Sequence, residues 1–310
     1  MEKEKKEKTE RGFSKIQTIS SAFSRTSIQE EIEIPFEIQK SISETVRETF
    51  NLFQETTPLP LPNLPDNLEV YFEDFVNIFV RALVQELNAN IPDDLEDTVN
   101  QRPSKAKIVL KRQGKLSTRE DRVKVLDQYT PNGPVEFILE ITLKGFKWKL
   151  LVIEVKNPIT INKTASITQA LLEGLACCSK NSRTEMDIHR CDVLSETCYV
   201  CGADDCDDCS CSSTDQEAEE AEILSAHLSP HIPSYAALTD FNKWKLWKIS
   251  TLEGERDEEF SITPITLNHQ PILDNSKINY TELDKIFTCF YSVILDSLNK
   301  LSDFQNGSFE

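Results

Sequence analysis

The chain has 310 residues and a mass of 35.4 kDa, enough for one large domain or two modest ones. Hydrophobic residues make up 39% and charged residues 28%, which allows a sizeable core while part of the chain stays unfolded. The absence of a run of about 18 apolar residues excludes a membrane-spanning helix, and the charged first residues lack the apolar stretch of a secretory signal. We therefore expect an intracellular protein, cytoplasmic or nuclear, with no membrane partner.

The net charge of −18 is distributed unevenly. Residues 181–222 hold 13 acidic and 2 basic side chains, a local charge of −11, whereas residues 102–124 hold nine basic and two acidic ones, a local charge of +7. Polyanion binding follows the local patch more than the total. The basic segment 102–124 therefore predicts contact with DNA or RNA, although a solvated, lysine-rich hairpin would have the same composition.

The first part of the chain is predicted to lack a core of its own. Residues 1–30 are charged and rich in Ser and Thr, which is typical of a disordered tail, and a short helix is expected within 34–53. The proline-rich stretch 57–65 predicts an extended linker and a boundary. We therefore expect a tail and linker over residues 1–65 and a folded domain over 66–310.

The remaining elements follow in the order helix, strands, helix, strands, helix. Apolar spacing predicts a core helix over 66–91, strands over 105–112, 135–143 and 148–156, a helix over 166–180, strands over 234–240 and 243–250, and a helix over 281–301. The acidic, Cys-rich stretch 181–222 has no sustained periodicity, which predicts an inserted loop. This order predicts an α/β fold, a mixed central sheet flanked by helices.

The predicted hairpin of strands 135–143 and 148–156 carries charged residues among apolar ones. The odd-numbered positions from 135 to 143 in the first strand, and Leu151, Ile153 and Val155 in the second, are apolar, so each set occupies one face. Both sets face one core if an odd-length loop pairs residue 143 with residue 147, and Glu136 then lies opposite Glu154. The second face would carry Glu136, Glu140, Glu154 and Lys156 together.

Opposed carboxylates on adjacent strands are about 5 Å apart at Cβ and repel unless a cation or a proton lies between them. A hard divalent cation such as Mg²⁺ or Mn²⁺, with open positions for water and a phosphate oxygen, would satisfy Glu136 and Glu154. Lys156 follows on the same face and would hold an attacking water or neutralise the phosphorus centre. The alternative is an ordinary solvated strand face with Glu and Lys.

The stretch GPVEFILEITLKGFKWKLLVIEVKNP, followed by ITQALLEG, resembles the core of the PD-(D/E)XK nuclease superfamily, including crinkler-like fungal proteins. The resemblance implies the restriction-endonuclease-like fold and metal-dependent hydrolysis of phosphodiester bonds in nucleic acid. It places Glu136 at the first acidic position, Glu154-Val155-Lys156 at the Glu/Asp-X-Lys triplet and Gln169 at the helix glutamine. It also allows an acidic residue on the first helix, for which Glu86 is the candidate.

The sequence departs from this family at Glu136, where the family usually has Asp, and the additional methylene displaces the carboxylate. A catalytically silent module that binds nucleic acid or a protein partner, or acts as an effector, is therefore the alternative function. Gln169 lies early in its helix, so we expect its side chain to approach Glu154 or Lys156. A solvent-facing glutamine is the alternative.

The pairs Cys198–Cys201 and Cys206–Cys209 have spacings that zinc sites use. These four thiolates would form a knuckle-like zinc site, and the alternative is an acidic loop with reduced cysteines. Cys177, Cys178 and Cys289 are expected to be small core residues.

Overall fold

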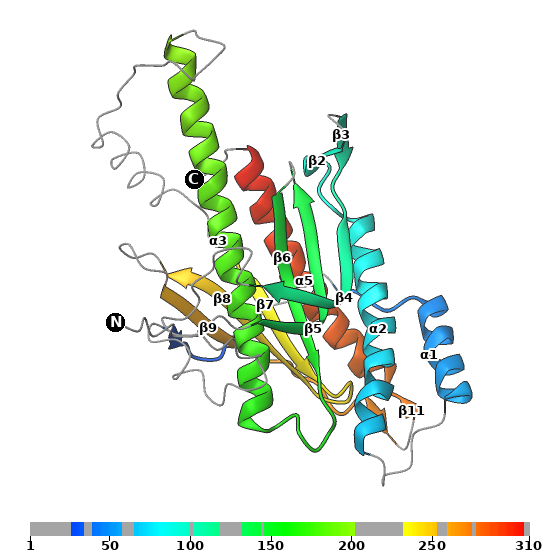
Figure 1. Ribbon diagram of the computed structural model, residues 1–310. Helices are drawn as coiled ribbons and strands as arrows, with labels where there is room; N and C mark the ends of the chain where they lie inside the picture. The colour runs from blue at the N-terminus through cyan, green and yellow to red at the C-terminus, as the bar shows by residue number, and fades with distance from the viewer. Residues whose placement is uncertain are drawn as a thin grey trace, which may run out of the picture.

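The computed structural model describes residues 26–33, 39–57, 65–99, 102–117, 132–143, 146–201, 232–252, 259–274 and 277–306 (Figure 1). Side chains are described for most of these residues but not for the distal half of the long helix α3 (Thr164–Cys201). The predicted α/β fold with a mixed sheet flanked by helices is confirmed.

The sheet has seven strands in the order β1-β9-β8-β7-β6-β5-β4. Their bounds are β1 (Thr26–Ile28), β4 (Ile108–Ser117), β5 (Asn132–Leu143), β6 (Phe146–Val155), β7 (Ser234–Thr239), β8 (Trp244–Leu252) and β9 (Glu259–Ile265). Strands β4, β5 and β6 form an antiparallel meander, α3 connects β6 to the parallel strand β7, and β7, β8 and β9 are antiparallel. Two small hairpins, β2 (Glu96–Val99) with β3 (Arg102–Lys105) and β10 (Leu273–Asp274) with β11 (Lys277–Ile278), lie outside this sheet.

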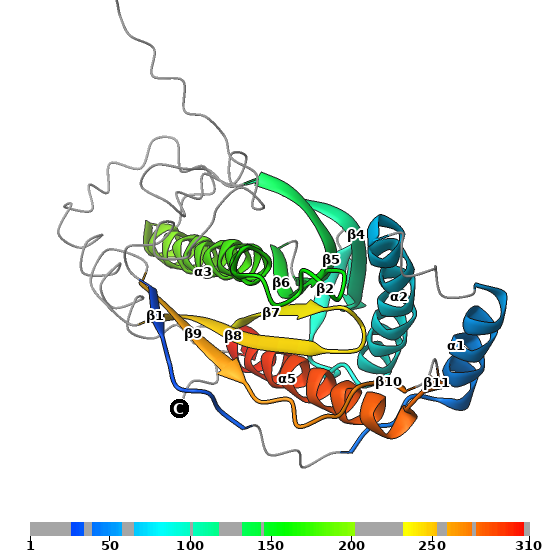
Figure 2. The same cartoon turned by 90° about the horizontal axis from the view of Figure 1, so that it is seen from below.

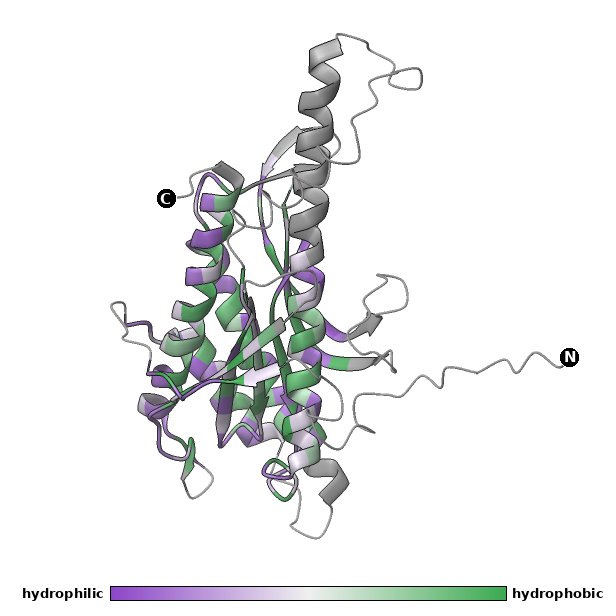
Figure 3. Cartoon of the chain, turned by 90° about the vertical axis from the view of Figure 1, so that its left-hand side faces the viewer, coloured by the Kyte–Doolittle hydropathy of each residue, from purple (hydrophilic) through white to green (hydrophobic). Residues whose placement is uncertain are grey.

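Helices cover both faces of the sheet (Figure 2). Helix α3 packs on β6, β7 and β8, whereas α2 (Pro65–Ala89) and α5 (Tyr280–Asn306) cover the other face. Hydrophobic residues concentrate in the central strands and on the helix faces turned toward them (Figure 3). The core is therefore divided by the sheet into a larger cluster under α2 and α5 and a smaller cluster under α3.

Helix α2 forms where the apolar spacing predicts a core helix. Phe75, Phe79 and Leu83 on this helix are fully buried. The ring centroids of Phe75 and Phe241 are 4.8 Å apart, and those of Phe79 and Trp244 are 4.9 Å apart. These contacts fix α2 against the turn between β7 and β8, and so fix the amino-terminal end of the helix beside the end of β6.

The boundary predicted at residue 65 does not separate the folded part from the preceding residues. The expected short helix is present as α1 (Glu44–Thr56), and its Phe50 is fully buried in the larger cluster. Strand β1 pairs in parallel with β9, within a stretch predicted to be a disordered tail. Both segments contribute backbone pairing or apolar surface to the same sheet and core, which the tail composition does not reveal. Residues 1–25 and the linker residues 58–64 lie outside the described residues.

The register of β5 with β6 differs from the prediction near the turn but agrees at the other end. Leu143 pairs with Phe146 rather than with residue 147, and a β-bulge follows between Leu139 and Glu140. The bulge adds one residue to β6, so that Phe137 pairs with Ile153. The parity required by the buried apolar face is thereby restored, and this register, continued by one residue, places Glu136 opposite Glu154.

Helix α3 continues to Cys201, past the predicted helix end at residue 180, so the first part of 181–222 is helical rather than a loop. Asn181 is fully buried and exchanges two hydrogen bonds of 2.9 Å with the backbone N–H and carbonyl of Lys149 beside the bulge. Its amide also donates to Ser234 Oγ at 3.1 Å. This residue holds the helix to β6 and β7, and a periodicity argument does not detect such a polar contact.

Candidate functional site

The site lies where β6 ends and the chain turns toward α3. The Lys156 backbone N–H donates to the Thr239 carbonyl at 2.8 Å, which continues the parallel pairing with β7 beyond Val155. Asn157 then forms a turn, because its Oδ1 accepts from the backbone N–H groups of Ile159 and Thr160 at 3.0 Å. The strand end is therefore fixed by backbone bonds on one side and an Asn turn on the other.

The two predicted acidic residues face each other across β5 and β6. Glu154 is 1% exposed, and its Oε1 accepts a hydrogen bond from Lys156 Nζ. Glu136 is only partly buried, and its Oε2 accepts from the backbone N–H of Val155. The predicted placement of Glu136, Glu154 and Lys156 on one face is confirmed.

Helix α3 brings two polar side chains to this pair. Gln169 Nε2 donates to Glu154 Oε1 at 2.5 Å and to Glu173 Oε1 at 3.1 Å. The predicted approach of Gln169 to Glu154 is confirmed. Glu173, one turn later, is fully buried. A Cβ added at the next residue, Gly174, would lie 2.8 Å from Ala236 Cβ, so glycine allows the helix to approach the sheet closely.

A fourth carboxylate comes from the opposite layer. Glu69 Oε1, near the start of α2, lies 3.5 Å from Lys156 Nζ. Glu86, the candidate from the sequence for an acidic site residue on the first helix, instead forms an ion pair with Lys40 at 2.5 Å. Glu140 is also outside the site, because it pairs with Lys111 at 2.6 Å. Glu69 and Glu86 are 17 residues apart, almost five turns of helix, and only tertiary packing decides which of them reaches the strand end.

The electrostatic environment favours protons or cations at these carboxylates. Burial, with the charge of Glu154, raises the pKa of Glu136 to about 9, and burial raises the pKa of Glu154 to about 7 against the opposing effect of Lys156. Burial and the Glu154 charge raise the pKa of Glu173 well above its usual range. Burial alone would lower the pKa of Lys156, but Glu154 and Glu136 outweigh it and raise that pKa. Lys156 therefore stays charged, whereas Glu136 and Glu173 keep their protons at neutral pH unless a cation replaces them.

The donor set suits a hard divalent cation. Carboxylate oxygens are the ligands that Mg²⁺ and Mn²⁺ prefer, and the buried atoms Glu154 Oε2 and Glu173 Oε2 accept no hydrogen bond from the described residues. Within the same part of the chain, no three His, Cys, Asp or Glu side chains already form a metal cage. The carboxylates are instead linked through Gln169 and Lys156, so binding of a cation would require side chains to turn toward it.

The basic segment has its described charges largely paired with acids. Lys105 pairs with Asp93 at 2.8 Å, Lys111 with Glu140, and Arg112 with Glu73 at 2.6 Å. Residues 118–124 lie outside the described residues. The basic segment 102–124 thus presents less unpaired positive charge than the sequence predicts.

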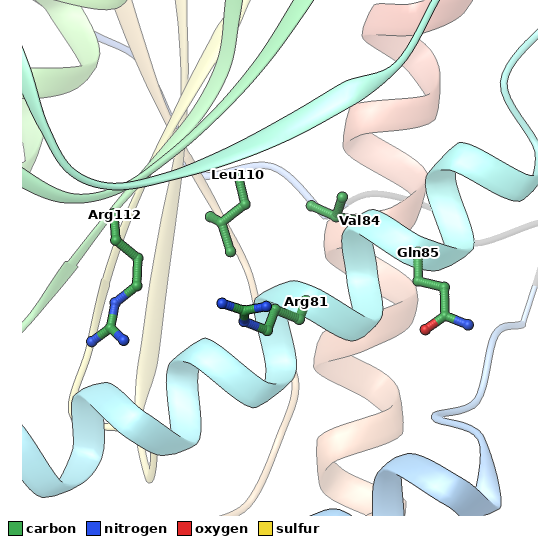
Figure 4. A pocket seen from close by; sticks show the side chains of 5 residues that line it. All are labelled: Arg81, Val84, Gln85, Leu110 and Arg112. Atoms are coloured by element: carbon green, nitrogen blue, oxygen red, sulfur yellow. The ribbon is translucent and has the colours of Figure 1, made fainter.

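An open pocket of about 640 Å³ lies between α2 and β4 (Figure 4). Its lining combines guanidinium groups, an amide and an apolar floor: Arg81, Val84, Gln85, Leu110 and Arg112. Arg81 bonds to Asn77 at 3.2 Å and forms no ion pair with a carboxylate of the described residues. Arg81 and Gln85 are exposed, so this pocket offers the free donors that most of the basic segment lacks.

The predicted zinc cluster lies largely beyond the described part of the chain. Cys198 and Cys201 are in the last turns of α3, where side chains are not described, and Cys206 and Cys209 fall within 202–231. Cys177, Cys178 and Cys289 are buried free thiols, as expected. No helix among the described residues is both long and apolar enough to cross a bilayer.

No family model matches this chain, and no curated protein or solved structure matches it. The geometry of the site therefore carries the functional argument.

Proposed function

We propose that the protein hydrolyses phosphodiester bonds in nucleic acid with the help of Mg²⁺ or Mn²⁺, on a restriction-endonuclease-like fold. The observation that carries this proposal is the hydrogen-bonded group of Glu154, Lys156 and Gln169 with Glu136 opposite, at one strand end. A meander of three antiparallel strands, followed by a helical crossover to a parallel fourth strand, supports the fold assignment. The four residues occupy the positions that the PD-(D/E)XK resemblance implies.

The cation would be held by Glu136 and Glu154. The unpartnered Glu154 Oε2 supports this assignment, because a buried carboxylate oxygen without a partner is costly. When bound, a divalent cation polarises the phosphoryl group and lowers the pKa of a coordinated water. Glu136 and Glu154 would lose their protons to bind it.

Lys156 supplies the permanent positive charge of the site. Its side chain is 16% exposed, and its ammonium group lies between Glu154 and Glu69. In the proposed reaction it stabilises the negative charge that develops on the phosphate oxygens, and it orients the attacking water. Gln169 donates both amide hydrogens to carboxylates, so its carbonyl oxygen remains free to accept a hydrogen bond from that water.

The pocket between α2 and β4 would contact a flanking part of the substrate. Arg112 lies over the ring of Phe137, the neighbour of Glu136, and pairs with Glu73, one helical turn after Glu69. Arginine donates two parallel hydrogen bonds to a phosphate, and an apolar floor accommodates a sugar or base. Arg81, which forms no ion pair with a carboxylate of the described residues, is therefore the proposed phosphate contact, in place of the paired Lys105, Lys111 and Arg112 of the basic segment.

A cleavage assay tests the proposal. Generic single- and double-stranded DNA and RNA are incubated with the protein in Mg²⁺, in Mn²⁺ and in a chelator. We expect cation-dependent cleavage that the substitution Lys156→Ala reduces by about 10²–10³-fold, the usual loss when one electrostatic donor is removed. Lys285→Ala is the matched control, because Lys285 also pairs with a glutamate but lies 51% exposed on α5. Equal cleavage by the Lys156→Ala protein and the unaltered protein would contradict the proposal.

A catalytically silent binding module is the second candidate, and the Glu136 contact favours it. The longer side chain folds back so that Oε2 accepts a bond from the Val155 backbone. A Glu136→Asp substitution separates the two candidates. A gain of cation-dependent cleavage on that substitution, from none in the unaltered protein, would identify a silent site.

A further inference from the structure

Three carboxylates in the site share one pattern of hydrogen bonding. In each, one oxygen is held by a donor of the chain: Glu136 Oε2 by the Val155 N–H, Glu154 Oε1 by Lys156 and Gln169, and Glu173 Oε1 by Gln169. The second oxygens of the two almost fully buried carboxylates, Glu154 Oε2 and Glu173 Oε2, accept no hydrogen bond from the described residues. The site thus orients three carboxylates and leaves one buried oxygen of both Glu154 and Glu173 without a donor in the described part of the chain.

Glu173 is the least expected member of this group. Glu173 is fully buried on the α3 face of the sheet, among apolar neighbours such as Leu172 and Ala176. A carboxyl group that is buried with one unpartnered oxygen destabilises the fold by about 1–3 kcal/mol or more. The purely structural contact with Gln169 uses only one of its two oxygens.

We propose that Glu173 is a third carboxylate ligand for a hard divalent cation, together with Glu136 and Glu154. This inference rests on the metal site of the proposed function and adds a ligand from α3 to the two from the sheet. When all are deprotonated, these three carboxylates and Glu69 carry, together with Lys156, a net charge of −3, and one Mg²⁺ or Mn²⁺ neutralises two of these charges. Neither Glu136 nor Glu154 alone explains why a third acidic side chain lies beneath them.

Two structural details make this placement workable. Gly174 allows the helix to lie close to β7 and β8. The amide nitrogen of Gln169 donates a hydrogen bond to both Glu154 and Glu173, which keeps the two carboxylates near each other. The alternative is that Glu173 is a permanently protonated acid that only supports Gln169. In that case Glu173 would influence the cation indirectly, and removing Gln169 would have a comparable effect.

Binding of Mn²⁺ alone, without nucleic acid, tests the assignment. The full chain is titrated with Mn²⁺, and the free ion is measured by its electron paramagnetic resonance signal. The compared proteins carry Glu173→Gln, Glu136→Gln, Gln169→Met or the control Glu86→Gln, which removes a carboxylate paired with Lys40. Glutamine at position 173 keeps an oxygen that accepts from Gln169 but removes the negative charge.

We expect Glu173→Gln to weaken Mn²⁺ binding as much as Glu136→Gln does. The loss should be larger than that of Gln169→Met, which removes a residue that only holds the ligands and should weaken binding by roughly tenfold. Glu86→Gln should bind as the unaltered protein does. Unaltered binding by Glu173→Gln, or a loss no greater than that of Gln169→Met, would overturn the assignment and leave the proposed function intact. Absence of Mn²⁺ binding by the unaltered protein would overturn both.

The variants are compared only as folded proteins. Thermal unfolding without metal gives the stability of each, and added Mn²⁺ should raise the unfolding temperature of the unaltered protein. If Glu173→Gln does not fold, Glu173→Asp provides the test, because it keeps the charge on a shorter side chain. Binding by Glu173→Asp equal to that of the unaltered protein would then contradict the role of Glu173 as a directly contacting ligand.

Discussion

Charged side chains are paired and partly exposed on one face of the sheet, and buried and incompletely paired on the other. On the face of α2, charged side chains pair with one another near the surface, as Arg112 does with Glu73. On the face of α3, Glu154 and Glu173 are almost completely buried, and each has an oxygen that accepts no hydrogen bond from the described residues. Paired, exposed charges contribute little to stability, whereas buried and incompletely paired charges are costly and cluster at functional sites. This contrast locates the candidate site more clearly than the charge of the sequence does.

The largest expected effect concerns the close approach of α3 to the sheet. Gly174→Val should destabilise the protein by about 3 kcal/mol, because its side chain would overlap Ala236 and Ile249. Denaturant unfolding gives the free energy. Gly174→Ala should cost less, and stability unchanged by either substitution would mean that α3 packs farther from β7 and β8 than described.

A smaller loss is expected at the polar contact beside the bulge. Asn181→Ala should lower the free energy of unfolding by about 2 kcal/mol, because it leaves the Lys149 N–H buried without an acceptor. Thermal and denaturant unfolding measure this change. A loss below about 0.5 kcal/mol, the scale of ordinary surface substitutions, would contradict the buried role of Asn181.

The buried carboxylates also predict how stability depends on pH when no divalent cation is present. The pKa values of Glu136 and Glu154 are raised in the folded protein to about 9 and about 7, so the folded state binds more protons than the unfolded state above pH 4.5. Stability should therefore fall as pH rises from about 4.5 toward 9. The comparison protein is Glu136→Gln/Glu154→Gln, and an identical pH slope in both would contradict this prediction.

The smallest effect is expected on the α2 face. A double-mutant cycle of Arg112→Ala and Glu73→Ala should give a coupling energy below about 1 kcal/mol, because the Arg112 side chain is 39% exposed. Chemical unfolding of the four proteins measures it. A coupling above about 3 kcal/mol would place this pair among buried ion pairs and would remove the contrast between the two faces.

The sequence predicts the parity of the central hairpin because an apolar face must be buried, whatever the turn does. It does not predict the bulge between Leu139 and Glu140, since two compensating shifts of register leave the same alternation. The prediction of an odd-length loop was therefore wrong, whereas the prediction that Glu136 and Glu154 lie opposite each other was right.

Glu69 and Glu173 were missed for different reasons. Glu173 stands within an otherwise apolar helix stripe, one turn after Gln169, and that position was a usable signal. Glu69 lies on α2, and its proximity to Lys156 depends on the aromatic packing of Phe75 and Phe79, which joins segments far apart in sequence. The helical extension past residue 180 was missed because its anchor is the polar residue Asn181.

Proton release on cation binding tests most directly the central claim that protons and a divalent cation compete for the strand-end carboxylates. Titration calorimetry with Mn²⁺ in buffers of different ionisation enthalpy counts the protons released. At pH 7, where Glu136 is protonated and Glu154 is about half protonated, we predict release of between one and two protons from this pair and one more from Glu173 as the third ligand, with fewer released by Glu136→Gln. Mn²⁺ binding without proton release, or no binding at all, would contradict the account.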